Sequence, residues 1–438
     1  MRASRLCVLS ILLAALLLAA CGPFAAPTVS RRTVLPTTAP TTSGSHGPLA
    51  AQAYAPDDIR AAYDIAPLHQ QGITGQGQTV VLIESFGDPT LQADIDAYNQ
   101  RYNLPPITIQ VIAPIGSKPF DPSNDDMLGW AGETALDAEI VHAVAPGAKI
   151  VVLTSPVSET EGTIGLPEFR QLEQYALDHH LGSVISMSWG VSEVTLTDTA
   201  GRAEIAKWDT LFHQATTQQG VTFVTGSGDN GATDFADLTP TQLSSTATTS
   251  FPSDDPWVTS AGGTTLLTDG NHFFDESAWD GSGGGFSRFF ATPDYQKTLP
   301  AAVQSQLQNR RGVPDIAANA DPHSGWIIRA LNRWQVIGGT SAAAPFWAGL
   351  IALANQKAGH PLGFINPALY QLAQGKGTAD FRDITTGNNT FDGTGDRGGS
   401  LVHVQGYPAV PGWDPITGLG SPDAAKLIPD LITAAGGS

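Results

Sequence analysis

The chain has very little cysteine. Its 438 residues include only Cys7 and Cys21, both close to the N-terminus. The rest of the chain therefore cannot form a disulfide bond, and its stability must come from a hydrophobic core, with a bound metal ion as a further contribution.

Charge is also sparse, and most of it is negative. Charged residues make up 14% of the chain, and 41 acidic against 22 basic residues give a formal net charge of −19. The basic surface that nucleic acid requires is missing, so we expect no nucleic-acid partner. The excess of carboxylates fits an acidic environment, and it fits simple solubility equally well.

The apolar run at residues 8–20 is too short to span a bilayer comfortably. It follows Arg2 and Arg5, which is typical of a signal peptide, here residues 1–20. The run ends in Leu-Ala-Ala-Cys-Gly, which resembles the lipobox of bacterial lipoproteins, so Cys21 is a candidate lipid anchor. We expect export from a bacterial cell, as a cell-surface lipoprotein or a secreted protein. Ordinary cleavage nearby and an uncleaved anchor are the alternatives.

Residues 21–52 are rich in Thr, Pro, Ser and Ala and carry few large apolar side chains. Such a segment cannot bury a core, and we interpret it as a linker. Residues 53–438 then form the folded domain.

Within that domain, apolar runs alternate with helical patterns. The runs predict buried strands at residues 79–83, 149–153, 183–187 and 221–225. Helical patterns lie at residues 89–102, 133–144, 169–180 and 203–219. This alternation predicts a doubly wound α/β fold, with a mainly parallel sheet and helices on both faces.

A serine stands at the start of another predicted helix. The sequence Gly-Gly-Thr-Ser-Ala-Ala-Ala-Pro at residues 338–345 places Ser341 behind two glycines and ahead of an apolar run. Unpaired N–H groups and the positive end of the helix dipole at that position would stabilise an oxyanion. An ordinary helix cap is the alternative.

No histidine of the sequence lies in a motif typical of the general base of a serine-hydrolase triad, so Ser341 has no evident histidine partner. Of the ten histidines, His46 lies in the predicted linker and His142 on a predicted helix. Carboxylates are better candidates, because Glu133 and Asp137 are four residues apart on that helix and share a face among apolar residues. Two buried carboxyls this close would share a proton, which raises the pKa of one of them. A solvated acidic face is the alternative.

A third carboxylate, Asp229, follows the predicted strand 221–225 within Ser-Gly-Asp-Asn-Gly. The strand would deliver it to the carboxyl end of the sheet, where doubly wound folds place their sites. A plain turn is the alternative. The acidic stretch at residues 121–126 shows no metal-binding pattern, and we interpret it as a solvated loop.

Five short motifs, in this order, resemble the sedolisins, the family of serine-carboxyl peptidases. They are Gly-Glu-x-x-Leu-Asp at 132–137, Ser-x-Ser-Trp-Gly at 186–190, Ser-Gly-Asp-x-Gly at 227–231, Gly-Gly-Thr-Ser at 338–341 and Gly-Trp-Asp-Pro-x-Thr-Gly-x-Gly-Ser-Pro at 412–422. Each motif alone is weak, but the resemblance extends from about residue 53 to the end. It implies a subtilisin-like fold and an endopeptidase that acts through an acyl-enzyme intermediate.

The resemblance also implies a Ser-Glu-Asp triad. Ser341 would be the nucleophile, Glu133 the general base and then the general acid, and Asp137 the residue that holds Glu133 by a hydrogen bond. Asp229 would donate a hydrogen bond to the oxyanion. The carboxylate network would be supported by two further residues at matching positions, Glu84 and Trp189.

These groups favour acidic action. A glutamate with a reference pKa of about 4.3 is a poor base for a serine at neutral pH. Asp229 donates a hydrogen bond only when it is protonated. We therefore expect maximal peptidase activity below about pH 5, with loss as Asp229 ionises.

The resemblance further implies one Ca²⁺ ion near the C-terminus. Its ligands would be the carboxylates of Asp383 and Asp414 and the carbonyl oxygens of Ile384, Val410 and Gly412, and Ca²⁺ prefers such oxygen donors. Close relatives have glycine at the position of Val410, and valine tolerates unusual dihedrals poorly. Two surface aspartates in turns are the alternative.

Most members of the family carry a long N-terminal propeptide, and here we expect only the signal and the linker ahead of the catalytic domain. We expect a monomer that acts on protein or peptide substrates and meets a membrane only through Cys21. A non-catalytic peptide-binding lipoprotein on the same scaffold is the alternative, which the full set of triad residues disfavours. A conventional subtilisin is disfavoured by the missing histidine context.

Overall fold

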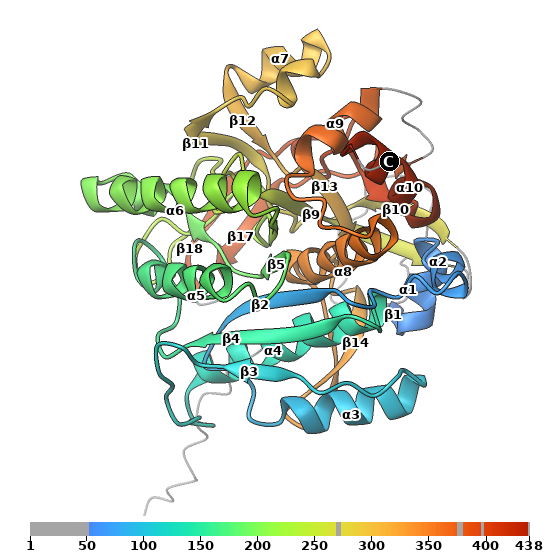
Figure 1. The fold of residues 1–438 in the computed structure, drawn as a ribbon. Coiled ribbons are helices and arrows are strands. Elements are labelled where there is room, and N and C mark those ends of the chain that lie inside the picture. Colours follow the sequence, from blue (N-terminus) through green and yellow to red (C-terminus); the bar gives the residue numbers. More distant parts are fainter. Residues whose placement is uncertain (1–51, 269–272, 375–379, 396–397, 437–438) are drawn as a thin grey trace, which may run out of the picture. The chain divides into compact units, whose positions relative to one another are not determined.

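The computed structural model describes residues 52–268, 273–374, 380–395 and 398–436 (Figure 1). Ala51–Ser438 forms one compact unit, separate from Met1–Ala50. The predictions of a signal peptide, a lipidated Cys21 and a linker fall on residues outside the described ones.

A mainly parallel sheet forms the centre of this unit. Its strands are β2 (Thr79–Ser85), β3 (Gln110–Ile112), β4 (Lys149–Ser155), β5 (Val184–Met187), β7 (Thr222–Gly226), β9 (Thr259–Thr268), β10 (Phe273–Ala278) and β13 (Ile316–Asn319). The strand order is β10-β9-β7-β5-β2-β4-β3, and β13 also pairs with β9. Among these pairings only β9 with β10 is antiparallel. The four strands predicted from apolar runs are therefore confirmed.

Helices cover both faces of the sheet, as β2 illustrates. Val80 and Leu82 join the core cluster that includes residues of α4 (Asp125–Val144) and α8 (Thr340–Ala358). Their neighbours Val81 and Ile83 point the other way, into the cluster with α5 (Leu166–Asp178) and α6 (Thr199–Gln218), drawn green in Figure 1. Burying each such side chain stabilises the fold by about 1.5–3 kcal/mol. The predicted doubly wound architecture is confirmed.

The remaining elements surround this centre. The other helices are α1 (Pro56–Ala62), α2 (Ala66–Gln70), α3 (Leu91–Tyr102), α7 (Ala301–Leu307), α9 (Asn366–Gln374) and α10 (Ala424–Ala434), with 3-10 turns η1 (Glu193–Leu196) and η2 (Gln296–Thr298). Smaller sheets pair β1 (Gln52–Tyr54), β14 (Ser324–Ala330) and β15 (Arg333–Ile337); β6 (Val191–Ser192) and β8 (Ser250–Phe251); β11 (Gly285–Ala291) and β12 (Arg310–Val313); β16 (Phe381–Arg382) and β19 (Ser421–Pro422); and β17 (Phe391–Gly395) and β18 (Gly398–Val404).

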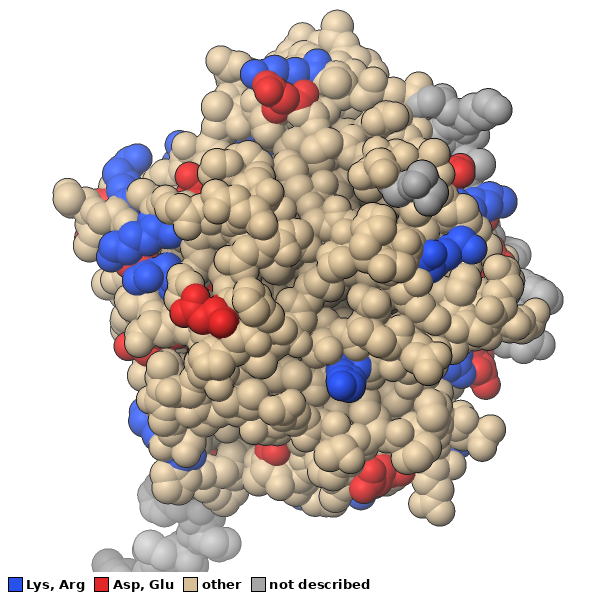
Figure 2. Space-filling view, viewed as in Figure 1, with Lys and Arg blue, Asp and Glu red and all other residues tan. Residues whose placement is uncertain are grey.

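Charged side chains are sparse on the face shown in Figure 2, as the composition predicts. Many carboxylates lie inside instead, among them Glu84, Asp137, Glu173 and Asp255, each fully buried. In the described parts of the chain, no helix combines the length and the apolar character needed to cross a bilayer.

Candidate active site

The carboxyl ends of three neighbouring strands bring two predicted site residues, Glu84 and Asp229, close to Ser188. Glu84 is the next-to-last residue of β2, Ser188 follows β5, and Asp229 follows β7. The three strands are adjacent and parallel, so these residues meet at one edge of the sheet.

Ser341 is the second residue of α8, whose N-terminus lies against the end of β7. A side chain built on Gly226, the last residue of β7, would come within 2.8 Å of Thr340 Oγ1. The helix is fixed in the core, where Trp347 Nε1 donates to the Ala317 carbonyl at 3.0 Å. Ser341 thus stands on a rigid element, beside backbone N–H groups that have no partner within the helix.

The helix α4 supplies two carboxylates, Glu133 and Asp137. It begins eight residues before the predicted start, because Asn124 caps it by accepting a hydrogen bond from Met127 N. Asp137 is fully buried and accepts hydrogen bonds from Ser188 Oγ at 2.8 and 2.9 Å. Ser188 Oγ also lies 3.3 Å from the Ser341 carbonyl oxygen, so it connects the carboxylate network to α8.

Burial raises the pKa of every carboxyl in this network. The pKa values of Glu84 and Asp137 lie well above their ordinary range, because both groups are desolvated and each is near a second carboxyl. A hydrogen bond between the two raises the pKa of Glu84 and lowers that of Asp137. Two carboxyls can share a hydrogen bond only if one of them is protonated, so this pair holds at least one proton.

Glu133 is set apart by its contact with Ser341. Burial raises its pKa to about 7, a side-chain hydrogen bond with Ser341 acts in the opposite direction, and the nearby charge of Asp229 raises the pKa further. Part of the residue faces the cleft, but its Oε1 is buried and has no hydrogen-bond partner among the described residues. A pKa near 7 is close to the reference value of about 6.5 for histidine.

Asp229 is clamped against the start of α8. Its Oδ1 accepts hydrogen bonds from Thr340 N at 2.7 Å and Thr340 Oγ1 at 2.8 Å. Gly339 has φ of 110°, and a Cβ there would lie 2.6 Å from Asp229 Oδ2. Only glycine fits both constraints, which explains the residue before Thr340-Ser341 in physical terms.

Trp189 packs at the back of the cleft. It is 6% exposed, and its ring meets Phe169 edge-on at 5.0 Å and lies tilted against Trp208 at 5.5 Å. The aromatic cluster fixes the segment Ser188-Trp189-Gly190, which lines the cleft.

Two adjoining hollows, of about 250 and 380 Å³, form the cleft beside Ser341 and Glu133. Both are lined by Asp126, Glu159 and Ser188, and no histidine among the described residues lines either one. The interpretation of residues 121–126 as a solvated loop is wrong for Asp125 and Asp126, which are the first two residues of α4 and line the cleft. Sequence reasoning also gave no role to Ser188, although it stands inside a matched motif.

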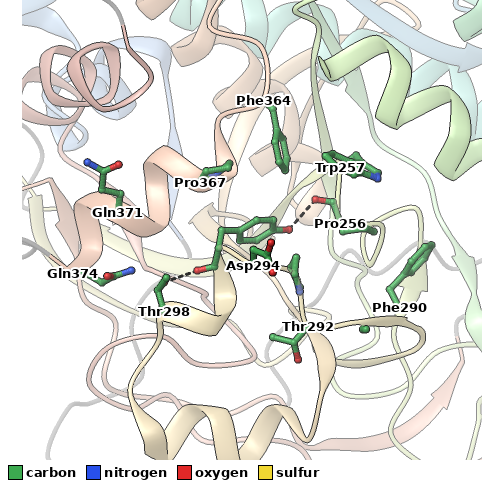
Figure 3. A pocket seen from close by; sticks show the side chains of 13 residues that line it. Pro256, Trp257, Phe290, Thr292, Asp294, Thr298, Phe364, Pro367, Gln371 and Gln374 are labelled. Atoms are coloured by element: carbon green, nitrogen blue, oxygen red, sulfur yellow. Dashed lines mark hydrogen bonds between the residues drawn. The ribbon is translucent and has the colours of Figure 1, made fainter. Parts of the chain in front are cut away.

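A larger hollow lies elsewhere (Figure 3). It has about 770 Å³ and is walled mainly by Trp257, Tyr295 and Phe364, with Tyr295 donating to the Pro256 carbonyl at 2.9 Å. None of the predicted catalytic residues lines it. The chemistry of the lining, and not its size, identifies the candidate active site.

Comparisons with known proteins agree with this geometry. Residues 126–371 match the subtilase family. The chain is 35% identical over 395 residues to kumamolisin from Bacillus sp. (strain MN-32), an alignment that covers 87% of this chain and 64% of kumamolisin. The chain belongs to the sedolisin family. It is also 29% identical over 390 residues to sedolisin from Pseudomonas sp. (strain 101), covering 86% of this chain and 61% of that one.

A solved structure of a sedolisin-family protein supports the fold. Pseudomonas sedolisin, a serine-carboxyl proteinase complexed with two molecules of pseudo-iodotyrostatin, aligns with a TM-score of 0.71 at 27% identity. The alignment covers 87% of this chain and 99% of that structure. The sedolisin-family chain spans less than two thirds of the full length of the curated relatives kumamolisin and sedolisin.

The five residues expected to bind Ca²⁺ come from two segments that meet near the C-terminus. Both carboxylate oxygens of Asp383 accept from Gly412 N, at 3.1 and 3.0 Å. The second carboxylate, that of Asp414, is buried, and it accepts from Val410 N at 3.2 Å. Burial raises the pKa of Asp414 to about 6.

This donor set fits a calcium ion. In the described residues, the carbonyl oxygens of Ile384, Val410 and Gly412 accept no backbone hydrogen bond outside helices and strands, so they are available as ligands. Val410 lies outside the left-handed backbone region, so the concern that valine would resist the required dihedrals does not apply. Two carboxylates and three carbonyls are the oxygen ligands that Ca²⁺ prefers.

Proposed function

We propose that the chain is an acid-acting serine-carboxyl endopeptidase, which hydrolyses peptide bonds through a Ser-Glu-Asp triad and an acyl-enzyme intermediate. The observation that carries the proposal is the side-chain hydrogen bond of Ser341 with Glu133, a carboxyl whose pKa burial raises to about 7. A carboxylate of that basicity can accept a proton from a serine hydroxyl more readily than an exposed glutamate can.

The residues have distinct roles in the proposed reaction. Ser341 Oγ attacks the carbonyl carbon of the substrate while its proton passes to Glu133. The proton then moves from Glu133 to the leaving amine, which departs and leaves an acyl group on Ser341. A water molecule, deprotonated by Glu133, attacks this ester and releases the second product.

Asp229, the start of α8 and Asp137 would stabilise charge in these steps. Protonated Asp229 and the N–H groups at the start of α8 would donate to the oxyanion of the tetrahedral intermediate. Asp137 is held by Ser188 and would orient Glu133 and stabilise its proton when it arrives.

The direction of the pH dependence follows from the two required protonation states. Glu133 acts as a base only when ionised, and Asp229 donates only when protonated. The rate follows the fraction of ionised Glu133 multiplied by the fraction of protonated Asp229, and this product peaks midway between the two pKa values. If Asp229 ionises below the pKa of Glu133, the peak lies on the acid side of neutrality. The raised pKa of Glu133 moves this optimum upward from that expected with an ordinary glutamate, and the optimum below about pH 5 stays a prediction.

A single Ca²⁺ ion is proposed at the carboxylates of Asp383 and Asp414 and the carbonyls of Ile384, Val410 and Gly412. When bound, it would supply a structural cross-link between two segments of a chain whose described part has no disulfide. We also propose that the protein is exported and monomeric, with Cys21 as a lipid anchor.

The test is cleavage of a peptide library across pH 3–8, with Ser341→Ala as the control. We expect internal cleavage with an acid optimum in the wild type and none in the variant. Turnover by Ser341→Ala, or an optimum near pH 8, would refute the scheme. The comparisons offer no support for a non-catalytic peptide-binding lipoprotein, which would bind the library without cleaving it.

A further inference from the structure

Carboxyl groups that the triad does not use gather in the same cleft. Glu159 and Glu161 lie on the loop between β4 and α5, Asp234 follows the turn of Asp229, and Asp126 is the second residue of α4. All four line the hollow that contains Ser341. A surface of this kind is strongly acidic if its groups are ionised.

Two of these carboxyls are held in place by local hydrogen bonds. Glu161 Oε2 accepts from Ser192 N at 3.0 Å and Thr195 Oγ1 at 2.9 Å. Asp234 Oδ1 accepts from Phe235 N at 2.9 Å and Asn230 Nδ2 at 3.2 Å. Their positions at the cleft are therefore fixed before any ligand arrives.

Glu159 differs because one of its carboxyl oxygens receives no hydrogen bond from the described residues. The residue is only 9% exposed, and its Oε1 is buried without a hydrogen-bond partner among the described residues. The backbones of Glu159 and Gly165 pack closely, since a Cβ added to Gly165 would lie 2.5 Å from Glu159 Cα. An unsatisfied buried carboxyl is destabilising, so its presence beside Ser341 points to a ligand that supplies the missing donor.

An organic cation carries hydrogen-bond donors of this kind, whereas a metal ion needs several ligating side chains close together. Within the described residues, no three acidic, histidine or cysteine side chains come close enough together to hold a metal. The hollow has about 250 Å³, which is room for a side chain with a flexible stem and a charged end.

We propose that the carboxyl-lined hollow is a substrate subsite for a lysine or arginine side chain, with Glu159 and Glu161 as its specificity-determining residues. The proposal rests on the proposed peptidase function and names the class of substrate that this cleft prefers. A guanidinium group would suit the site best, because it presents several donors to separated carboxylates at once.

The protonation of the empty site is consistent with this role. Burial raises the pKa of Glu159 well above its ordinary value and that of Glu161 to about 9, and in both cases a neighbouring carboxyl raises it further. In acid these groups are therefore neutral before the ligand binds. A cation that enters replaces a proton, so its binding should release protons to the solvent.

The test compares peptides that carry arginine with isosteric peptides that carry citrulline, which keeps the shape and removes the charge. At pH 5 we expect kcat/KM to be at least tenfold higher for arginine at one position of the peptide. Glu159→Gln and Glu161→Gln should each reduce this ratio several-fold, whereas Asp178→Asn, on the exposed end of α5, should leave it unchanged. The ratio is measured within one preparation, so partial misfolding does not alter it.

Binding of the same peptides to the Ser341→Ala variant measures the affinity of the subsite in the absence of cleavage. Calorimetry should show at least tenfold tighter binding of the arginine peptide, with proton release that the citrulline peptide lacks. Equal binding of the two peptides, or selectivity that survives in both glutamine variants, would overturn the subsite. Selective binding without cleavage by the wild type would support the subsite and refute the peptidase function instead.

Discussion

Replacing Glu133 by glutamine should make the protein more stable at neutral pH and leave its stability near pH 4 almost unchanged. Glutamine keeps the shape of a protonated glutamate and cannot ionise. Because the folded state raises the pKa of Glu133, that state binds the proton more tightly than the unfolded chain does. The wild type therefore loses stability as the pH rises and the group ionises, and the variant avoids this loss.

The size of the effect follows from the pKa change. The pKa of Glu133 rises from an ordinary 4.5 to about 7. At about 1.4 kcal/mol for each pKa unit, this shift corresponds to roughly 3 kcal/mol of unfolding free energy. The contribution is fully present below pH 4.5, declines between pH 4.5 and 7, and is absent above pH 7. The difference between Glu133→Gln and the parent protein should follow the same curve.

Urea denaturation between pH 4 and 8 measures this difference, in a Ser341→Ala background that prevents self-digestion. The background removes the hydrogen bond that lowers the pKa of Glu133, so the effect should be at least as large there. Asp178→Asn, on the surface, is the control and should show no such curve. A stability difference that does not change with pH, or a variant less stable than its parent at pH 8, would refute the reasoning.

Three further changes test other parts of the site. Asp229→Asn provides an amide that donates at any pH, so the falling limb of the pH–rate profile should disappear; an unchanged limb would show that another group causes it. Asp137→Asn should lower kcat on a peptide substrate by about 100-fold or more, with a small change in KM, because Asp137 orients the proposed base without touching the substrate. A near-normal kcat would contradict this role. Chelation of Ca²⁺ should lower the melting temperature by about a few degrees, and Asp383→Asn should make the melting temperature insensitive to the chelator. The same melting temperature with and without Ca²⁺ would refute the proposed calcium site.

Four strands of the sheet could be predicted from the sequence because each is a short run of mostly apolar residues. Residues such as Val80 to Ile83 are apolar on both faces, and only a doubly covered parallel strand requires that pattern. The start of α4 was placed too late, because a polar cap at Asn124 and the acidic first turn precede the apolar spacing. Capping by a single side chain leaves a weaker signal than a repeated apolar pattern.

The candidate site was predictable where a motif named the residue and its type limited the chemistry. Ser341, Glu133, Asp137 and Asp229 were found in this way, and the structure brings them to one edge of the sheet. Glu159 was missed because its character comes from burial without a partner, which depends on packing between segments far apart in the sequence.

In the proposed mechanism, the burial of Glu133 links catalysis to folding through one free energy. The desolvation that would make this carboxylate a stronger base also weakens the fold when the group ionises. Substitutions that open the site to water should relieve the neutral-pH instability and at the same time return the base to the strength of an ordinary glutamate. Selection for durability at neutral pH would therefore act against the catalytic power of this protein.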